Sequence, residues 1–349
     1  MSGRKGIVAG GNWIIDHVKV IDSWPAQDTL VSILQQTSSN GGSPYNVLKA
    51  LSRLGAGYPL AGVGLVGDDA DGDAIRADCA ANRIDTAGLT AMAGVATSYT
   101  DVMTVKEGGR RTFFHQRGAN ALLGPEHFDF TTTTARHFHL GYLLLLDRLD
   151  QLENDRPRAA EVLARARAAG LSTSVDCVSE SSDRFRRVIL PVLPEVDLLF
   201  ANDFEAEKLT GLSLRHDGVI DATAVGAAAQ ALLRQGVRGW VIMHFPEACY
   251  AASAEGAGHW QSSVRLPAAE IAGASGAGDA LAAGVLHGWH EGWPMSECLR
   301  LGVCAAASSL RHPTCSEGVR PVAECLILAE RHGFYLPRPE RPHDPAVLS

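Results

Sequence analysis

Asp279 follows a run of small residues, 273–278, that leads into an alanine-rich helical pattern. Small residues let a backbone approach a ligand closely, and a helix start presents unpaired N–H groups and the positive end of its dipole. This is the pattern of an anion site. An aspartate beside an anion needs a separate task, and the one that fits is general base for a hydroxyl group. Asp279 would accept the proton of a hydroxyl that attacks a phosphoryl group, whose charge is stabilised by the amides of Gly276, Ala277 and Gly278.

The same stretch has a simpler interpretation. A strand-like run at 263–271 could enter a helix through a glycine-rich turn, with Asp279 placed where the helix dipole favours an acid. Short glycine motifs also arise often by chance. Both interpretations remain open on this stretch alone, so the rest of the chain has to decide.

The length and composition of the chain limit the classes of protein to which it can belong. The 349 residues suffice for one large α/β domain with a small attachment, and the net charge of −8 argues against nucleic-acid or anionic-membrane partners. The seven cysteines are scattered without a C-x-x-C pair, which favours reduced thiols over a disulfide framework or a zinc site. With neither a signal peptide nor a run of about 20 apolar residues, we expect a cytoplasmic protein. The proline-rich end, 337–349, is expected to be flexible.

Strand and helix patterns alternate along most of the chain. Strand patterns occur at 6–11, 58–66, 137–141, 172–176, 196–201, 238–243 and 249–252. Helical patterns occur at 44–54, up to about residue 82, and at 158–169, 182–193, 204–210, 222–235, 279–291, 295–310 and 322–331. The alternation predicts an α/β fold over 1–336, a single domain with a mostly parallel central sheet and helices on both faces. Ligands bind such sheets beyond the carboxyl ends of the strands.

A second group of β patterns falls outside this alternation. The runs 14–21 and 29–34 come early, with a turn expected at 38–42, and 99–105 and 111–116 flank a glycine pair typical of a hairpin. We expect these runs to form a small β lid inserted in the domain at about 13–37 and 97–118.

Two polar clusters near the N-terminus are candidate ligand contacts. Asn12 and Asp16 follow the first strand, and a carboxylate there can accept the two hydroxyl hydrogen bonds that a polyol offers. Gly41 and Gly42 precede a helix whose first turn holds Asn46, so backbone and amide could both meet a ligand. A turn asparagine with a solvated aspartate, and a plain helix-initiating turn, explain these residues equally well.

Asn202 and Glu205 follow an apolar strand and open a helix with the spacing of a capping box. Alternatively, the two side chains could hold water on a Mg²⁺ ion near phosphates, because Mg²⁺ keeps several waters and takes few protein ligands. Both interpretations can hold at once.

Two other patterns are set aside. The segment 62–67 matches G-x-G-x-x-G, but apolar residues continue the strand through its glycines, and the next residues are acidic. The aspartates at 69, 71 and 73 imitate a calcium loop that lacks its glycine and glutamate positions. There is no P-loop pattern, so any nucleotide is held in another way.

The order of the motifs resembles the ribokinase-like (PfkB) carbohydrate kinase family, from residue 10 to about 329. Five segments carry the resemblance: GNWIID (11–16), NGGSPYNVLKALSRLG (40–55), VGLVGDDADG (63–72), NDFEAEKLTG (202–211) and ASGAGDALAAG (274–284).

The resemblance implies ATP-dependent transfer of the γ-phosphoryl group to a hydroxyl of a small sugar or sugar-like substrate, with Mg²⁺. It implies that Asp279 is the base and 276–278 the anion hole. Asn202 and Glu205 would organise Mg²⁺ and phosphates through water, without a direct protein ligand. A lid would exclude water from the substrate and could join two copies into a homodimer. The substrate contacts would be Asn12, Asp16, Gly41, Gly42 and Asn46.

The chain departs from the family pattern in three places. Gly273 and Ala274 replace the usual Asp-Thr, whose carboxylate is associated with a monovalent-cation site, so potassium activation is not expected. The nucleotide-lining T-x-G-x-x-G reads MHFPEA at 243–248, and Pro44 and Tyr45 suggest an unusual substrate pocket. Two alternatives follow: a sugar-binding paralogue with impaired ATP use, and a nucleoside kinase, because GNWIID resembles adenosine-kinase versions of that segment.

Overall fold

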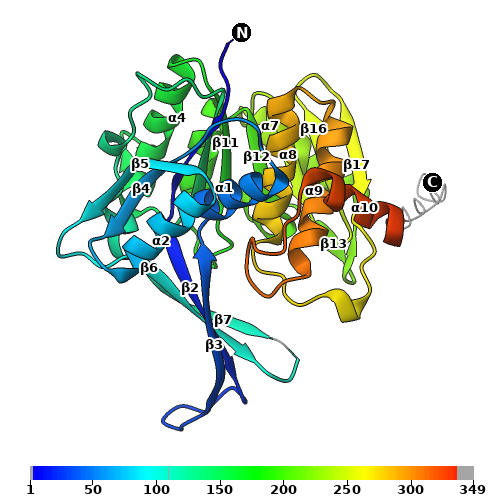
Figure 1. Ribbon diagram of the computed structural model, residues 1–349. Coiled ribbons are helices and arrows are strands. Elements are labelled where there is room, and N and C mark those ends of the chain that lie inside the picture. The colour runs from blue at the N-terminus through cyan, green and yellow to red at the C-terminus, as the bar shows by residue number, and fades with distance from the viewer. Residues whose placement is uncertain (1–2, 109, 336–349) are drawn as a thin grey trace.

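The computed structural model describes residues 3–108 and 110–335 (Figure 1). A nine-stranded sheet forms its centre. Strand β16 pairs antiparallel with both β15 and β17, and all other neighbouring strands pair in parallel. In spatial order the strands are β17 (Gly258–Ser262), β16 (Ala248–Ser253), β15 (Trp240–His244), β12 (Leu198–Asn202), β11 (Ser172–Cys177), β8 (His137–Leu143), β1 (Ile7–Gly11), β4 (Leu60–Gly67) and β5 (Ile84–Met92). The predicted mostly parallel sheet is confirmed. The tail predicted to be flexible, 337–349, lies outside the described residues.

Helices cover both faces of this sheet, as predicted (Figure 1). One face carries α1 (Ser43–Leu54), α2 (Ala70–Ala81), α8 (Ala277–Glu291), α9 (Met295–Leu310) and α10 (Val322–His332). The other carries α4 (Arg158–Ala168), α5 (Phe185–Ile189), α6 (Asp203–Thr210) and α7 (Ala222–Arg234). Along β12, Leu198 and Phe200 enter the first core, whereas Leu199 and Ala201 enter the second. Because side chains alternate across a strand, a strand buried on both faces reads as a continuous apolar run.

The helix that follows the small-residue run is fixed by close packing. A Cβ atom on Gly284 of α8 would lie 2.8 Å from the Cα atom of Gly302 in α9. The two backbones therefore approach directly, which glycine alone permits. This contact holds the start of α8 in a defined place at the edge of the sheet.

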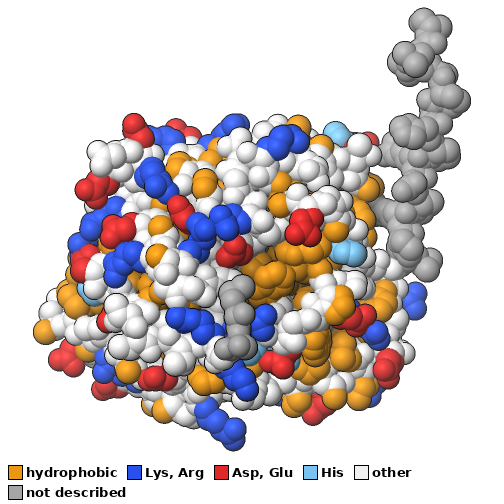
Figure 2. All heavy atoms as spheres, turned by 90° about the horizontal axis from the view of Figure 1, so that it is seen from above, with side chains coloured by type: hydrophobic (Ala, Val, Ile, Leu, Met, Phe, Trp, Pro, Cys, Tyr) orange, Lys and Arg blue, Asp and Glu red, His pale blue; other side chains and the backbone are white. Residues whose placement is uncertain are grey.

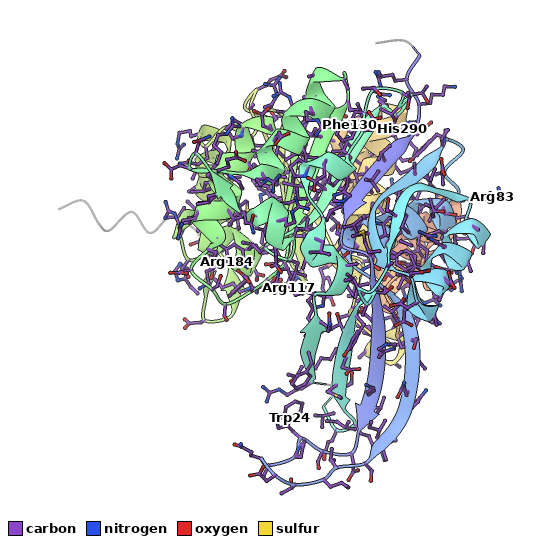
Figure 3. The ribbon with its side chains drawn as sticks, turned by 90° about the vertical axis from the view of Figure 1, so that its left-hand side faces the viewer. Trp24, Arg83, Arg117, Phe130, Arg184 and His290 are labelled. Atoms are coloured by element: carbon purple, nitrogen blue, oxygen red, sulfur yellow. The ribbon has the colours of Figure 1, made fainter. Side chains whose placement is uncertain are left out.

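A separate four-stranded sheet, here called the projecting sheet, extends away from the body of the molecule (Figures 1 and 3). Its order is β3 (Ile33–Gly41), β2 (Ile14–Ile21), β6 (Ser98–Val105) and β7 (Arg111–Gln116). Strand β2 pairs antiparallel with β3 and parallel with β6, so two distant parts of the chain meet. The predicted hairpin is confirmed as β6 and β7.

Several element predictions were wrong. The expected turn at 38–42 is the end of β3, which pairs with β2 up to Gly41 despite its polar sequence. The strand expected at 263–271 is irregular and ends in a 3₁₀ turn, Ala268–Glu270. Strand β5 was missed because it is an edge strand whose residues are mostly exposed and show no regular alternation of apolar and polar side chains. The helix at 182–193 is split into α5 and a 3₁₀ turn, Leu190–Glu195, that contains two prolines.

Within the described part of the chain, no helix is both long enough and apolar enough to cross a bilayer. All seven cysteines are buried with free thiols. Basic and acidic side chains are interspersed over the face of the molecule that Figure 2 shows.

Candidate active site

Three elements that are distant in sequence meet at the carboxyl edge of the central sheet. Tyr142 lies near the end of β8, Asn46 in the first turn of α1 and Asp279 in the first turn of α8. Both Tyr142 and Asn46 donate hydrogen bonds to the Asp279 carboxylate. The small-residue loop and the N-terminal motifs therefore share one site.

The Asp279 carboxylate has one occupied and one free oxygen. Its Oδ2 accepts from the Tyr142 hydroxyl at 2.6 Å and from Asn46 Nδ2 at 2.8 Å. Its Oδ1 is buried and has no hydrogen-bond partner among the described residues. Burial raises the pKa of Asp279, while the hydrogen bonds from Tyr142 and Asn46 oppose that rise. A buried acceptor without a partner calls for an explanation, and a ligand hydroxyl would supply one.

The loop before Asp279 is shaped by glycine. Gly276 caps α8 with a left-handed backbone, φ 73°, and a Cβ atom there would lie 2.7 Å from the Cβ atom of Cys315. A Cβ atom on Gly278 would lie 3.1 Å from the ring of His244. The first amides of a helix have no acceptor within it, so those around Ala277 are available to an anion.

Asp16 lies on the other side of the site, in β2 of the projecting sheet. Its Oδ2 accepts a weak hydrogen bond from the Cys315 thiol at 3.7 Å. Burial raises the pKa of Asp16 to about 7; a hydrogen bond from Thr100 opposes the rise and the charge of Asp279 adds to it. A Cβ atom on Gly41 would lie 2.5 Å from Asp16 Oδ1, so glycine is needed beside this carboxyl group.

The three asparagines of the site play different structural parts. Asn12 is fully buried, donates to the carbonyl of Leu145 at 3.2 Å and accepts from the Tyr142 amide at 2.5 Å. Asn40 donates to Asn46 Oδ1 at 2.6 Å, and this bond turns the Asn46 amide group toward Asp279. The Oδ1 atom of Asn40 is itself buried without a partner in the described chain. Contact of Asn12 with a substrate stays a prediction, because its bonds here go to backbone.

The backbone of Gly42 also belongs to the part of the site that contains Asn12 and Asn46. Its φ of 85° lies in the left-handed region, and a Cβ atom would lie 2.2 Å from the Asn12 carbonyl oxygen. Strand β3 therefore turns into α1 directly over the end of β1. Tyr45, in contrast, stacks on Trp13 and donates to Asp78, so its hydroxyl is engaged away from Asp279.

The predicted capping box at Asn202 and Glu205 is confirmed, with both reciprocal bonds at 2.9 Å. Ser179 donates to Glu205 Oε1 at 2.7 Å and accepts from Asn202 at 2.8 Å. Asp176, at the end of β11, is buried close by. Burial, and then the charges of Glu205 and Asp279, raise the pKa of Asp176 well above its usual value. Asp176, Glu205 and Asp279 are acidic groups whose negative charges repel one another, and a cation nearby would relieve that repulsion.

In the described ranges, no cluster of three or more His, Cys, Asp or Glu side chains could hold a metal ion directly. A Mg²⁺ ion at this edge would therefore keep most of its waters, with Glu205 and Asn202 as their acceptors. That role stays a prediction.

A hollow of about 490 Å³ opens beside the start of α8. Its walls include Phe204, Phe245 and Leu281, together with Gly278 of the small-residue loop. Both oxygens of Glu247 pair with Arg215 at 3.0 Å, and Arg215 also pairs with Asp203, so one guanidinium group serves two carboxylates. The altered 243–248 segment thus leaves an apolar recess next to the anion loop.

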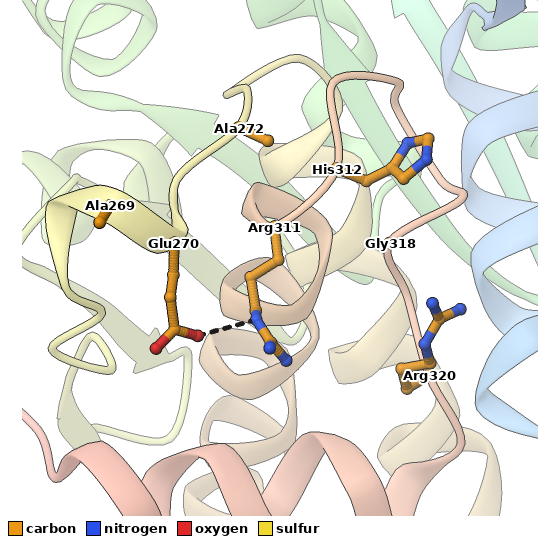
Figure 4. Close-up of a pocket in the computed structure, with 7 residues that line it drawn as sticks. All are labelled: Ala269, Glu270, Ala272, Arg311, His312, Gly318 and Arg320. Carbon is orange, nitrogen blue, oxygen red and sulfur yellow. Dashed lines mark ion pairs between the residues drawn. The ribbon is translucent and has the colours of Figure 1, made fainter.

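A second hollow, of about 430 Å³, lies between the segments 269–272 and 311–320 (Figure 4). Glu270 and Arg311 form an ion pair at 3.1 Å on one side of it. At the neighbouring position, a Cβ atom on Gly273 would lie 3.0 Å from the Cα atom and 3.1 Å from the carbonyl oxygen of Pro313. An aspartate at 273 would be crowded by this backbone, which is a physical reason for the departure noted in the sequence.

Sequence reasoning missed four residues of the site: Ser43, Tyr142, Asp176 and Arg111. Tyr142 and Asp176 both stand at the carboxyl end of a parallel strand, and that position was a usable signal. Arg111, from the projecting sheet, donates to the Ser275 hydroxyl in the small-residue loop. Nothing in the local sequence indicates that β7 reaches this loop.

Comparison with known proteins agrees with the geometry. A model of the pfkB family carbohydrate kinases matches residues 5–321. Fructokinase-1 of Oryza sativa subsp. japonica is 28% identical over 229 residues, 63% of this chain and 67% of that protein. An ATP-dependent ribose-1-phosphate kinase of Halopiger xanaduensis is 32% identical over 200 residues, 57% of this chain and 61% of that protein.

The fold has solved counterparts. The structure of Arabidopsis thaliana ribokinase complexed with ribose and ATP has a TM-score of 0.76 at 20% identity, covering 93% of this chain and 98% of that one. This similarity confirms the predicted ribokinase-like α/β fold. Because the family model spans nearly the whole chain and the five motifs fall in its order, the chain belongs to the pfkB family of carbohydrate kinases.

Proposed function

We propose that this protein transfers the γ-phosphoryl group of ATP to a hydroxyl of a sugar or sugar-like molecule, with Asp279 as general base. The observation that carries the proposal is the buried, unpartnered Oδ1 of Asp279 beside the first turn of α8. The substrate hydroxyl oxygen forms the new bond to the γ-phosphorus, and the bond from that phosphorus to the β,γ-bridging oxygen breaks. The hydroxyl proton passes to Asp279, and ADP leaves.

The anion loop stabilises the charge of the transferred group. Amides at 276–278 and the positive end of the α8 dipole face the position where that charge develops. The Arg111 guanidinium, hydrogen-bonded to Ser275, adds a cation at the same loop. Bound Mg²⁺ would neutralise phosphate charge, and Glu205 and Asn202 would hold its waters.

The substrate side supplies acceptors and donors for a polyol. Asp16 lies against the backbone of Gly41, and Asn40 bonds the Asn46 side chain that donates to Asp279. Asn40 Oδ1 is a further buried acceptor that lacks a partner in the described chain. The projecting sheet would act as a lid, because Asp16 and Arg111 both come from its strands. Closure of a lid excludes water that would otherwise hydrolyse ATP.

The nucleotide base would occupy the apolar hollow beside α8. Phe204 and Phe245 offer aromatic surfaces, and the hollow borders Gly278, so a base there would direct its phosphates toward the anion loop. Glu247 pairs with Arg215 and is not among the residues that line this hollow, which favours this kinase over the sugar-binding paralogue with impaired ATP use.

The test is a screen of thermal stability and ADP release with Mg-ATP over fructose, ribose, ribose 1-phosphate, 2-keto-3-deoxygluconate, inositols and nucleosides. We expect ADP release with at least one of the sugars or sugar derivatives. Stabilisation by a sugar without ADP release would support the paralogue instead. Turnover with a nucleoside and none with free sugars would support the nucleoside kinase.

A homodimer through the projecting sheet is also proposed. Its exposed apolar side chains are unusual for a monomer surface, and Trp24 stacks on Phe114 at 6.2 Å between ring centroids (Figure 3). The exposed set is Trp24, Leu30, Ile33, Leu34, Phe113 and Phe114. Light scattering should give twice the chain mass, and Phe113→Ser should shift the protein toward monomer. A monomeric wild type would refute the proposal.

A further inference from the structure

Asn40 has a side-chain oxygen that is buried and has no hydrogen-bond partner. The residue lies near the end of β3, pairs with Ile15 of β2 and is only 3% exposed. Its Oδ1 atom accepts no hydrogen bond from the described residues. A buried acceptor in that state costs free energy, because the oxygen has lost its bonds to water and gained none in return. The same is true of Asp279 Oδ1, to which the proposed function assigns the proton of the substrate hydroxyl.

Hydrogen bonds that start at Asp279 fix the orientation of the Asn40 amide group. A carboxylate accepts hydrogen bonds and donates none, so the atom of Asn46 that faces Asp279 is the donor Nδ2, at 2.8 Å. The other end of that amide group, Asn46 Oδ1, is therefore an acceptor, and it faces Asn40 Nδ2 at 2.6 Å. The positions of nitrogen and oxygen in Asn40 thus follow from the carboxylate of Asp279.

Ser316 fixes the same orientation independently. Its hydroxyl donates its one proton to the backbone carbonyl of Asn46 at 3.3 Å. A hydroxyl whose proton is engaged presents lone pairs to its other neighbours, and Ser316 accordingly accepts from Asn40 Nδ2 at 2.8 Å. Both hydrogens of Asn40 Nδ2 are therefore taken. Exchanging Nδ2 and Oδ1 would place the oxygen against two acceptors, so a flip of the amide group cannot give Oδ1 a partner.

Asn40 Oδ1 lies among residues of the substrate side of the site. Gly41, the next residue of β3, lies against the Asp16 carboxyl group, since a Cβ atom there would be 2.5 Å from Asp16 Oδ1. The side chain of Asn46 joins Asn40 to Asp279. The two oxygens without partners, Asn40 Oδ1 and Asp279 Oδ1, are thus connected through one asparagine side chain. One small polyol can span such a separation.

The chemistry of Asn40 Oδ1 defines the group that it binds. A carboxamide oxygen has no formal charge and only accepts hydrogen bonds, so its partner must be a donor. On a sugar or sugar-like molecule that donor is a hydroxyl group. A deoxy carbon, a ketone oxygen or an ether oxygen has no proton to give, and each would leave Asn40 Oδ1 buried without a partner.

We propose that Asn40 is a specificity-determining residue that accepts a hydrogen bond from a second hydroxyl of the substrate, close to the hydroxyl that faces Asp279. The inference rests on the proposed function and narrows its substrate class to polyols with two hydroxyl groups so placed. Asn46 and Ser316 are positioning residues, because they hold the Asn40 amide group with its oxygen free. The site rejects an analogue without the second hydroxyl, because that analogue leaves a buried acceptor unpaired.

The experiment is isothermal titration calorimetry of the full chain without nucleotide, with D-fructose, D-ribose and the single-deoxy forms of each sugar as probes. It compares the wild type with Asn40→Ala, which removes the oxygen. If Asn40→Ala fails to fold, Asn40→Ser takes its place, because the serine hydroxyl is too short to reach the position of Oδ1. Ser316→Ala is the matched control, since it removes a hydrogen bond of the same amide group and keeps Oδ1. Melting temperatures report on the folding of each variant.

In the wild type, we expect the loss of one particular hydroxyl to raise the Kd about 10–100-fold, the equivalent of about 1.4–2.8 kcal/mol. Asn40→Ala should bind that deoxy sugar within about threefold of its parent sugar, because the two changes remove the same hydrogen bond and are not additive. Ser316→Ala should keep most of the wild-type difference.

A merely structural role for Asn40 would weaken the binding of parent and deoxy sugars equally, and that result would overturn the proposal. Equal binding of every deoxy sugar by the wild type, or binding of neither parent sugar, would overturn it as well. Calorimetry involves no phosphoryl transfer. Discrimination that depends on Asn40, found together with no ADP release in the presence of Mg-ATP, would therefore refute the kinase proposal and leave this one standing.

Discussion

Asp279 and Asp16 are two carboxyl groups of one site whose surroundings differ. Burial raises the pKa of both. Asp279 sits in the first turn of α8 and accepts hydrogen bonds from Tyr142 and Asn46, which orient it and oppose the rise in its pKa. Asp16 lies on a strand of the projecting sheet, bonded to Thr100 and to the weak thiol donor of Cys315, and its pKa rises to about 7.

The different surroundings of Asp279 and Asp16 suit the two carboxyl groups to different tasks. A carboxylate oriented by two donors on one oxygen, with its other oxygen lacking a partner among the described residues, is fitted to accept a proton during reaction. A carboxyl group that titrates near neutrality, pressed against the backbone of Gly41, is fitted to bind hydroxyl groups. The chain therefore divides chemistry and recognition between a helix start in the body and a strand of the projecting sheet.

The largest expected effect is that of Asp279→Asn. Removing the proton acceptor while keeping the shape should lower kcat by about 10²–10⁴-fold. Sugar binding and melting temperature should change little, because the amide can still accept from Tyr142. Steady-state kinetics and calorimetric binding check this. Turnover within a few-fold of wild type would assign the base elsewhere.

A smaller effect is expected for Asp16→Asn. Loss of a charged acceptor for hydroxyl groups should raise the KM for the sugar about 10–100-fold, the equivalent of about 1.5–3 kcal/mol. The KM for ATP should stay unchanged, since Asp16 is not among the residues that line the apolar hollow. Kinetics with each substrate varied in turn measures the split. A rise in the KM for ATP alone would contradict the division of tasks.

A further effect concerns stability. The folded-state pKa of Asp16, about 7, lies above its usual value of 3.8, so the folded protein holds this proton where the unfolded chain has released it. The contribution of Asp16 to stability therefore falls as pH rises through that window, by about 1.4 kcal/mol per pH unit. The Asp16→Asn variant has no such loss of stability with rising pH. Its melting temperature should therefore exceed that of the wild type by an amount that grows from pH 5 to 7 and levels off above pH 7. A difference that stays constant with pH would contradict this prediction.

The prediction that potassium does not activate the enzyme can be tested by replacing the ion. Because Gly273 offers no carboxylate to a monovalent cation, and the Pro313 backbone crowds a Cβ atom at that position, we expect the wild-type rate to be unchanged when potassium is replaced by tetramethylammonium at constant ionic strength. A severalfold loss of rate in tetramethylammonium would show that another part of the chain binds the ion.

Much of this site could be predicted from sequence, because its residues occupy places that backbone geometry defines. Asp279 starts a helix after glycines, and Asn202 with Glu205 has the spacing of a capping box. The order of the motifs then placed these residues at the same edge of one sheet. The apolar strands of the central sheet were found for the same reason, since burial on both faces gives continuous apolar runs.

What was missed depends on contacts between distant segments. Strand β3 has a polar sequence and exists because its backbone pairs with β2. Tyr142 reaches Asp279 across 137 positions, and Arg111 reaches Ser275 across 164. Local pattern carries no record of such contacts.

The central claim is phosphoryl transfer to a carbon-bound hydroxyl with Asp279 as base, and ³¹P NMR of the reaction mixture tests it most directly. With Mg-ATP and the sugar that releases ADP, the wild type should give a phosphomonoester and ADP in equal amounts. Asp279→Asn should give neither while still binding ATP. Inorganic phosphate in place of the ester, or equal ester formation by Asp279→Asn, would contradict the claim.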